Sequence, residues 1–233
     1  MTATEVMALL EENRNERGIR NWDRLGEGTG GLESFGIGLT KLRKLAKQVG
    51  RDHELALRLW ESDNHDARLI GLLIDDPRVM TREQAEQQVE KVGIGSLAHV
   101  FSSCDATLAK APFVFKLASD WIKATDSLRK RCGYGLVYEL SKNTRKKELT
   151  DEFFLDCIDR IREQFESEDL WVRMAMGSAL MGIGKRNPKL NQAAVDLARE
   201  LGPIDFSEDG NRCEPFDVLK HLTNKDLKAR LGI

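Results

Sequence analysis

Two side chains near the middle of the sequence have types and a spacing that could stabilise a positive charge. Phe101 and Asp105 are four residues apart in a stretch whose pattern predicts a helix over 97–109, so they should share one helix face. An aromatic ring attracts a cation through its π face and a carboxylate attracts it by charge, so this pair could bracket a cationic group. The alternative is a packed Phe101 beside a solvent-facing Asp105, and the pattern alone favours that alternative.

A second candidate is one face of a helix predicted over 126–140. Cations and aromatic rings recur on this face at helical spacing: Arg131, Tyr134, Tyr138 and Lys142. The neighbouring face is apolar and consists of Leu128, Cys132, Leu136 and Leu140. Such a helix can lie on a core and offer its other side to an anion. An ordinary solvated basic face is the alternative.

The charge of the chain is nearly balanced but unevenly distributed. The net charge is −2, so composition alone does not mark a nucleic-acid-binding protein. The stretch 41–51 nevertheless has basic residues and no acid, namely Lys41, Arg43, Lys44, Lys47 and Arg51. The stretch 123–147 has eight basic residues against two acidic ones. Segregated charge of this kind can present a locally positive surface to a polyanion.

Composition and motifs exclude several classes of protein. Apolar residues make up 41% and charged residues 32% of the chain, as in a folded globular protein. We expect a cytoplasmic protein, because the sequence has no long apolar run and no signal-peptide core. Four widely spaced cysteines indicate reduced thiols: Cys104, Cys132, Cys157 and Cys213.

The sequence predicts no metal site, cofactor site or known catalytic motif. No two histidines are four residues apart, and we interpret all four as surface residues: His53, His65, His99 and His221. Neither a G-x-S-x-G elbow nor a phosphate loop occurs. Gly26, Gly28 and Gly31 satisfy G-x-G-x-x-G, but no strand precedes them, so we predict a flexible loop. The tryptophans are predicted to pack in the interior: Trp22, Trp60, Trp121 and Trp171.

Almost every segment has the pattern of an amphipathic helix, which predicts an all-α fold of about twelve helices. The predicted residues that begin these helices include Thr40, Asn64, Thr150 and Asn187. Aromatic residues precede arginines by eight positions three times, in the pairs Trp60 and Arg68, Trp121 and Arg129, and Phe165 and Arg173. In each pair the aromatic residue is predicted to end one helix and the arginine to lie early in the next. An acidic residue is predicted in the link between them: Asp66, Asp126 or Asp169. This degenerate repeat, with glycines inside the helices that allow close approach, predicts stacked helix pairs forming an α-solenoid with a concave inner surface.

Two stretches carry a resemblance to a known family. FGIGLTKLRKLAK at 35–47 and LALRLWESDNHDARLIGLLI at 55–74 resemble the N-terminal half of the AlkD-like DNA alkylation repair glycosylases, and the likeness continues to the region of Cys213 and Pro215. The resemblance implies a single domain over 1–233, a right-handed α-solenoid of HEAT-like repeats with a concave basic groove. It also implies release of cationic N-alkylated purines, 3-methyladenine and 7-methylguanine, from duplex DNA without base flipping and without a cofactor.

Carried over by position, the resemblance implies catalytic roles for Asp105 and Arg131. Arg129 is the second possible match for the family's active-site arginine. Phe101 stands where the family has one tryptophan, and Ser178 stands near the place of another. The predicted substrate- and DNA-binding residues are Phe101, by its place in the family pattern, and from the two basic stretches Lys41, Arg43, Lys44, Arg129, Tyr134, Tyr138 and Lys142. We expect a monomer, with DNA as partner and no membrane association.

Two other interpretations of the same sequence stay open. The missing tryptophans at 101 and 178 are compatible with a DNA-binding solenoid that is weakened or inactive as an enzyme. A protein-binding scaffold is the third possibility, because helical-repeat solenoids commonly serve that purpose.

Overall fold

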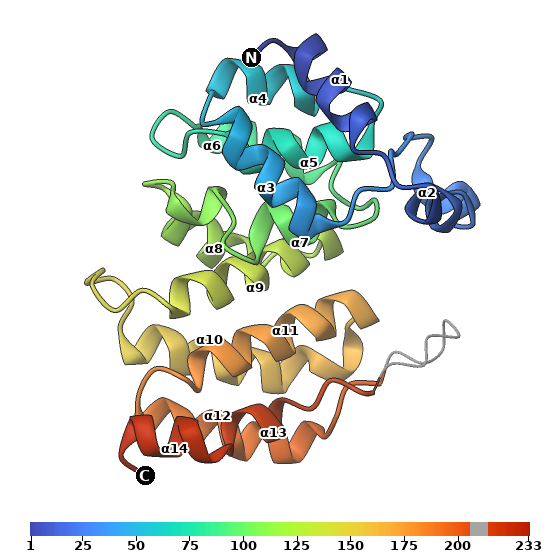
Figure 1. Cartoon of the computed structure of the whole chain (residues 1–233). Coiled ribbons are helices and arrows are strands. Elements are labelled where there is room, and N and C mark those ends of the chain that lie inside the picture. The colour runs from blue at the N-terminus through green and yellow to red at the C-terminus, as the bar shows by residue number, and fades with distance from the viewer. Residues whose placement is uncertain (206–213) are drawn as a thin grey trace. The chain divides into compact units, whose positions relative to one another are not determined.

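The computed structural model describes residues 1–205 and 214–233, which form helices and connecting segments only; Cys213 lies outside these residues. Internal contacts divide the chain into two compact units, Met1–Val114 and Phe115–Ile233. Figure 1 labels the helices in chain order. Apart from two isolated β-bridges, the described residues contain no strand pairing. The predicted all-α fold is therefore confirmed.

The first unit contains seven α-helices and two short 3-10 helices. The α-helices are α1 (Ala3–Glu12), α2 (Glu16–Asp23), α3 (Leu39–Val49), α4 (His53–Trp60), α5 (His65–Ile74), α6 (Arg82–Val89) and α7 (Leu97–Ser102). The 3-10 helices are η1 (Gly26–Thr29) and η2 (Leu108–Lys110). Helix α5 is central, since α1, α3, α4 and α7 all pack against it.

The second unit is built around the pair α9 and α11, which pack along each other. Its α-helices are α8 (Val114–Trp121), α9 (Ser127–Ser141), α10 (Asp151–Gln164), α11 (Leu170–Ile183), α12 (Pro188–Leu201), α13 (Val218–Leu222) and α14 (Lys225–Leu231), with the 3-10 helix η3 (Phe165–Ser167) after α10. Arg162 of α10 forms an ion pair with Glu200 of α12 at 3.0 Å.

Local side chains begin most of these helices at the predicted residues. Asn64, Thr150 and Asn187 each accept a hydrogen bond from a backbone N–H in the first turn of the following helix. Thr40 does not cap α3 as predicted. The helix begins at Leu39, after Gly38, so Thr40 lies inside the first turn.

The repeat predicted from aromatic and arginine spacing has a structural meaning. The Arg68 guanidinium lies 5.6 Å from the centre of the Trp60 ring, and Arg173 lies 5.9 Å from Phe165. In these two copies the arginine early in one helix therefore stacks on the aromatic residue that precedes it by eight positions. The predicted place of Asp66 in the link between helices is wrong, because Asn64 is the cap and Asp66 lies in the first turn of α5.

A glycine inside α5 allows the close helix approach that the sequence predicts. A Cβ atom built on Gly71 would lie 2.8 Å from the carbonyl oxygen of Ala56 in α4. Gly71 therefore lets α4 and α5 approach at their backbones, which offsets the roughly 1 kcal/mol cost of a glycine within a helix. The Gly26, Gly28 and Gly31 motif follows α2 rather than a strand, so it lacks the context of a dinucleotide site.

Candidate functional site

Helix α7 ends at Ser102, well before the predicted end at 109. The Ser102 hydroxyl donates a hydrogen bond to the Ala98 carbonyl, and short polar side chains of this kind compete with continued helix. Because Asp105 lies beyond the helix, Phe101 and Asp105 do not share a helix face, and that prediction is wrong. Phe101 is 2% exposed and belongs to the core, which also contradicts its predicted contact with DNA.

The backbone at Asp105 has an unusual conformation. Cys104 has φ 53° and Asp105 has φ 64°, and among the described residues they are the only two other than glycine with positive φ. A non-glycine residue in this region costs roughly 1–3 kcal/mol, and such residues cluster at functional sites. Two consecutive strained residues need a restraint. Nη2 of Arg43, from α3, supplies one by donating a hydrogen bond to the Cys104 carbonyl oxygen at 2.9 Å.

Asp105 lines a cavity of about 450 Å³ within the first unit. The other charged side chains of the lining are cations, namely Arg43, Lys47 and Arg51. Apolar and backbone atoms of α3, α5 and the α7–η2 connection complete the walls. We call this the Asp105 cavity. It combines one exposed carboxylate with three cations, so it can attract phosphates while placing one negative charge beside a developing positive one.

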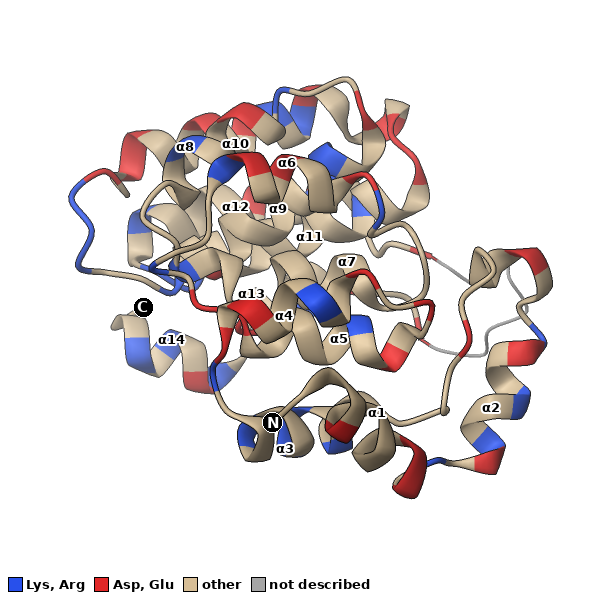
Figure 2. Cartoon of the chain, turned by 90° about the horizontal axis from the view of Figure 1, so that it is seen from above, with Lys and Arg blue, Asp and Glu red and all other residues tan. Residues whose placement is uncertain are grey.

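The basic residues of helix α3 differ in their surroundings. Arg43 donates to the Cys104 carbonyl, whereas Lys41 and Lys44 are open to solvent. Leu42, Leu45 and Ala46 are buried, and the helix packs against α5. Lys41 and Lys44 are exposed, and Figure 2 shows Lys and Arg along this helix. The predicted contact of Lys41 and Lys44 with DNA stays a prediction.

In the second unit, Arg131 stacks on an exposed tryptophan. The Arg131 guanidinium of α9 lies 4.8 Å from the centre of the Trp171 ring of α11, and Trp171 is 55% exposed. Burial lowers the pKa of Arg131 from its ordinary value, although arginine remains charged at neutral pH. The prediction that Trp171 packs in the interior is wrong. Its exposed ring with a stacked cation forms a flat platform suited to a nucleobase or sugar.

Arg129 is engaged at the start of its own helix. Nη1 of Arg129 lies 3.6 Å from the Asp126 carboxylate, which also caps α9. This placement agrees with a structural role shared with the other repeat arginines, whereas Arg131 stacks on the exposed Trp171.

Tyr134 does not lie on a surface, so its predicted contact with DNA is wrong. It is 0% exposed, and burial raises the pKa of its hydroxyl. Every residue of α9 from Cys132 to Ser141 is buried except Tyr138. Tyr138 is half-buried and Lys142 exposed, and Nζ of Lys142 lies 4.4 Å from the centre of the Tyr138 ring and 2.9 Å from a Glu139 oxygen.

Ser178, near the place of a family tryptophan, is half-buried in α11. Its hydroxyl donates to the Met174 carbonyl of the same helix at 2.9 Å. With Phe101 in the core, neither position presents an aromatic ring to solvent.

Sequence reasoning did not select Lys47, Arg51 or Trp171 as site residues. Lys47 and Arg51 belong to the basic run 41–51. Because they are far from Asp105 in the sequence, nothing in the pattern indicated that they line the same cavity. The sequence did contain a signal for Trp171. The apolar residues Val172, Met176, Leu180 and Ile183 recur at helical spacing and form one buried stripe of α11, and position 171 lies outside that stripe.

Histidines are not all surface residues. His65 is 6% exposed, its ring lies 4.4 Å from that of Trp22, and burial together with the nearby Arg68 charge lowers its pKa to about 4. Within residues 1–205 and 214–233, no group of three His, Cys, Asp or Glu side chains is gathered as a metal site would need. Among the same residues no helix has both the length and the apolar character required to cross a membrane.

The packed helix pairs α4–α5 and α9–α11 form an all-helical fold of the HEAT-like repeat type, as the structural match described below also shows. The chain belongs to the DNA alkylation repair enzyme family, whose sequence profile matches residues 6–205. The resemblance stated from the sequence is thereby confirmed at the level of the family.

Individual relatives are distant but cover most of the chain. The uncharacterized proteins Lin0241 of Listeria innocua and Lmo0209 of Listeria monocytogenes are each 23% identical over 196 residues, covering 82% of this chain and 83% of the relative. A similar solved structure comes from a family of proteins related to the HEAT-like repeat DNA glycosylases, with affinity for branched DNA structures. It superposes with a TM-score of 0.84 at 21% identity, covering 100% of this chain and 97% of that one.

Proposed function

We propose that the protein is a DNA N-glycosylase that releases positively charged N-alkylated purines, such as 3-methyladenine and 7-methylguanine, from duplex DNA. The observation that carries this proposal is Asp105, held in a strained left-handed conformation at the wall of a cavity whose other charged residues are basic. Membership of the DNA alkylation repair enzyme family supports it.

The reaction needs little covalent chemistry from the protein. An N-alkylated purine already carries positive charge, so it leaves readily when its bond to C1′ of the sugar breaks. The electron pair of that bond neutralises the purine, and positive charge develops on the sugar. The Asp105 carboxylate stabilises that charge and orients a water molecule, which adds to C1′ and releases its extra proton to solvent. Arg43, Lys47 and Arg51 hold the flanking phosphates.

The lining of the Asp105 cavity supports cleavage without extrusion of the base. Enzymes that flip a base out of the duplex commonly stack it between aromatic or apolar side chains. The residues of the first unit that line this cavity include no aromatic ring. A carboxylate reaching the sugar from outside the duplex therefore fits the residues better than a closed base pocket. In the second unit, Arg131 and Trp171 contact the DNA backbone and sugar.

Base release from methylated duplex DNA, measured for wild type and Asp105→Asn, tests the proposal. Asparagine has nearly the same shape and tolerates positive φ, so the backbone should be kept while the charge is removed. Release of 7-methylguanine should fall by about two to three orders of magnitude, as for other removed electrostatic groups. Asp23→Asn, which removes an exposed carboxylate of α2, is the control and should keep the wild-type rate. Release retained in Asp105→Asn would reject the assigned role.

A second candidate function is DNA binding without base release. Phe101 in the core and Ser178 in an internal hydrogen bond favour it, because both stand in place of family tryptophans. The structural relative with affinity for branched DNA suggests the substrate to use, a four-way junction beside a linear duplex of the same length. Salt-sensitive binding by wild type with no detectable release would establish this second function. Failure to bind either DNA at low salt would leave a protein-binding scaffold.

A further inference from the structure

The second unit contains a basic cavity that the proposed base release does not use. It measures about 450 Å³ and lies between the end of α9, the end of α11 and helix α14. We call it the α14 cavity. All of its charged lining residues are cations: Lys142, Lys185, Arg186 and Arg230. Tyr138 and Thr144 add hydroxyl groups.

Two of the four cations, Arg186 and Lys142, each donate to more than one protein oxygen. Nη1 of Arg186 donates to the carbonyl oxygens of Ser141 and Asn143 at 2.6 and 2.8 Å, and so satisfies backbone acceptors at the end of α9. Lys142 forms an ion pair with Glu139, outside the lining. The charge of Arg186 remains at the wall of the cavity even though its guanidinium donates to backbone oxygens. Burial lowers the pKa of Arg186, and the nearby charge of Asp151 partly opposes that effect.

Lys185 and Arg230 are the two cations available to a ligand. Arg230 donates one bond to the Lys185 carbonyl oxygen at 3.0 Å, which fixes α14 against the turn after α11. Within the described residues, neither side chain has a carboxylate within ion-pair distance. Burial and the positive charges of Arg230 and Lys142 lower the pKa of Lys185. An anion in the cavity would relieve this mutual repulsion.

The segment beside the cavity indicates what kind of anion fits. Thr144 of the lining begins a link that continues through Arg145, Lys146 and Lys147, with Glu148 as its only acid before Thr150. A single small anion would fill the cavity and leave this basic link unused. A strand with regularly spaced phosphates can occupy both, because the positive surface extends along the chain from the cavity.

We propose that the α14 cavity binds a phosphate group of a nucleic-acid strand through Lys185 and Arg230. The hydroxyl of Thr144 donates to the same phosphate, and the basic link 145–147 contacts the next phosphates. This interaction positions the strand on the second unit and requires no base release, so it goes beyond the proposed glycosylase activity.

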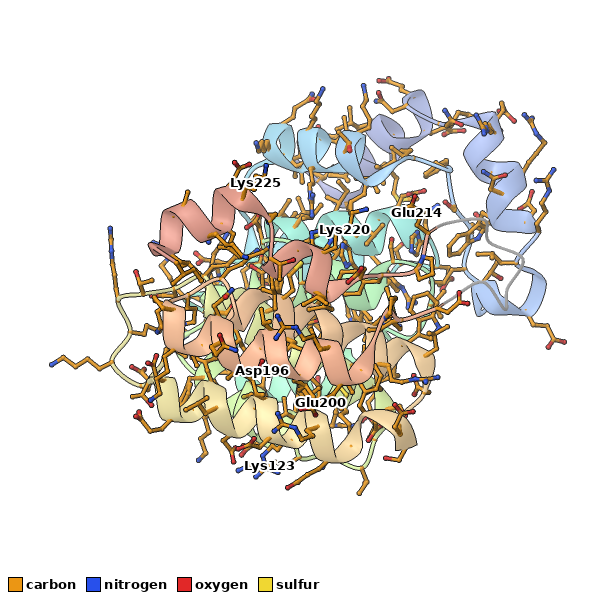
Figure 3. All side chains as sticks on the ribbon, turned by 90° about the horizontal axis from the view of Figure 1, so that it is seen from below. Lys123, Asp196, Glu200, Glu214, Lys220 and Lys225 are labelled. Atoms are coloured by element: carbon orange, nitrogen blue, oxygen red, sulfur yellow. The ribbon has the colours of Figure 1, made fainter. Side chains whose placement is uncertain are left out.

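Binding of fluorescent oligonucleotides tests this inference with two charge-matched double variants. Lys185→Gln with Arg230→Gln removes the two ligand cations. Lys189→Gln with Lys225→Gln removes two exposed cations outside the cavity; Lys225 lies at the N-terminal end of α14 (Figure 3). Anisotropy titrations at one low salt concentration should show that affinity falls by about tenfold or more for the cavity variant, as expected when charged hydrogen bonds are removed. Affinity of the control should fall by about threefold or less.

Equal decreases in the two double variants would overturn the inference, since only overall charge would then matter. If the double variant folds poorly, Arg230→Gln alone can be compared with Lys225→Gln alone. Both residues are exposed, so neither change should disturb folding, and only Arg230→Gln should weaken DNA binding strongly. Oligonucleotides with and without a 5′-phosphate distinguish binding of a terminal phosphate from binding of a backbone phosphate. If the cavity binds a terminal phosphate, the cavity variant should lose affinity only for the oligonucleotide that has the 5′-phosphate. The titrations detect binding alone, so absence of glycosylase activity would leave their outcome unaffected.

Discussion

At the scale of single residues, the main feature of the molecule is a carboxylate whose position depends on a neighbour. Asp105 follows another residue with positive φ, and the carbonyl between α7 and Asp105 is held by Arg43. Arg43 was predicted to contact DNA. Its observed bond gives it a second task, which is to position the segment that carries the acid.

Arg43→Gln tests this positioning role. Without the guanidinium, the segment at Cys104 can relax, and a displacement of about 1 Å at a reacting group can cost on the order of 100-fold in rate. The single-turnover rate of 7-methylguanine release at saturating DNA should fall by roughly 10- to 100-fold. Arg43→Lys, which keeps one donor, should recover part of the rate, whereas a residue that only binds DNA would change affinity and leave the saturated rate alone. Arg58→Gln, on the exposed side of α4, is the control.

The strain at position 105 predicts opposite effects on stability and activity. At φ 64° glycine is unstrained, whereas alanine retains the cost of a left-handed conformation. Asp105→Gly should therefore be more stable than Asp105→Ala by about 1 kcal/mol in urea unfolding, while both lose base release. Equal stability of the two variants would mean that the segment relaxes when the carboxylate is removed.

At the scale of elements, helix α5 organises the first unit and carries a buried pair of titratable residues in its first turn. Asp66 accepts hydrogen bonds from Ser34 and from the backbone N–H of Phe35, which ties the segment before α3 to α5. His65 packs against Trp22 of α2. Burial raises the pKa of Asp66 and lowers that of His65, so the two groups respond to pH in opposite directions.

His65 predicts a decrease of stability in mild acid. Its pKa is about 4 when folded and 6.5 as a free side chain, so the unfolded chain binds more protons between these values. The stabilising effect is fully present above pH 6.5 and disappears as the pH falls toward 4. It amounts to at most about 3 kcal/mol at 1.36 kcal/mol per pKa unit. Urea unfolding from pH 7 to 4.5 should show a steeper decline for wild type than for His65→Gln. Parallel curves would contradict this assignment.

At the scale of the whole molecule, the sum of charges gives no indication of a polyanion partner. The net charge is −2, yet α3 and the segment around the α14 cavity are basic. DNA responds to the local field rather than to the total. Salt dependence is therefore the property that should reveal the interface.

Lys41→Gln with Lys44→Gln should weaken DNA binding and reduce its dependence on salt. Removing one lysine–phosphate interaction lowers the slope of log affinity against log salt by about 1, so the slope of the double variant should be smaller by about 2. Because these residues are exposed and bind no base, the decrease in affinity should be similar for linear duplexes of different sequence. The Lys189→Gln and Lys225→Gln variant is the comparison, and its slope should stay within about 0.5 of wild type. An unchanged slope in the α3 variant would exclude Lys41 and Lys44 from the interface.

The order of the helices and most of their starting residues could be predicted from the sequence, because these features depend on neighbours three or four positions away. Asn64, Thr150 and Asn187 cap the helices that the pattern assigns to them. Asp105 was a candidate from the sequence by its spacing from Phe101 and by resemblance to a family, and its role stays a prediction. The pattern itself favoured an ordinary surface carboxylate.

Burial and strain were decided by the tertiary structure. Tyr134 has the helical spacing of a surface residue, but α9 is enclosed on several sides, so its ring is in the core while Trp171 is exposed. Periodicity identifies which residues share a face and does not say how many faces other helices cover. The early end of α7, the left-handed turn at Asp105 and the Arg43 bond across 61 residues likewise depend on contacts distant in sequence.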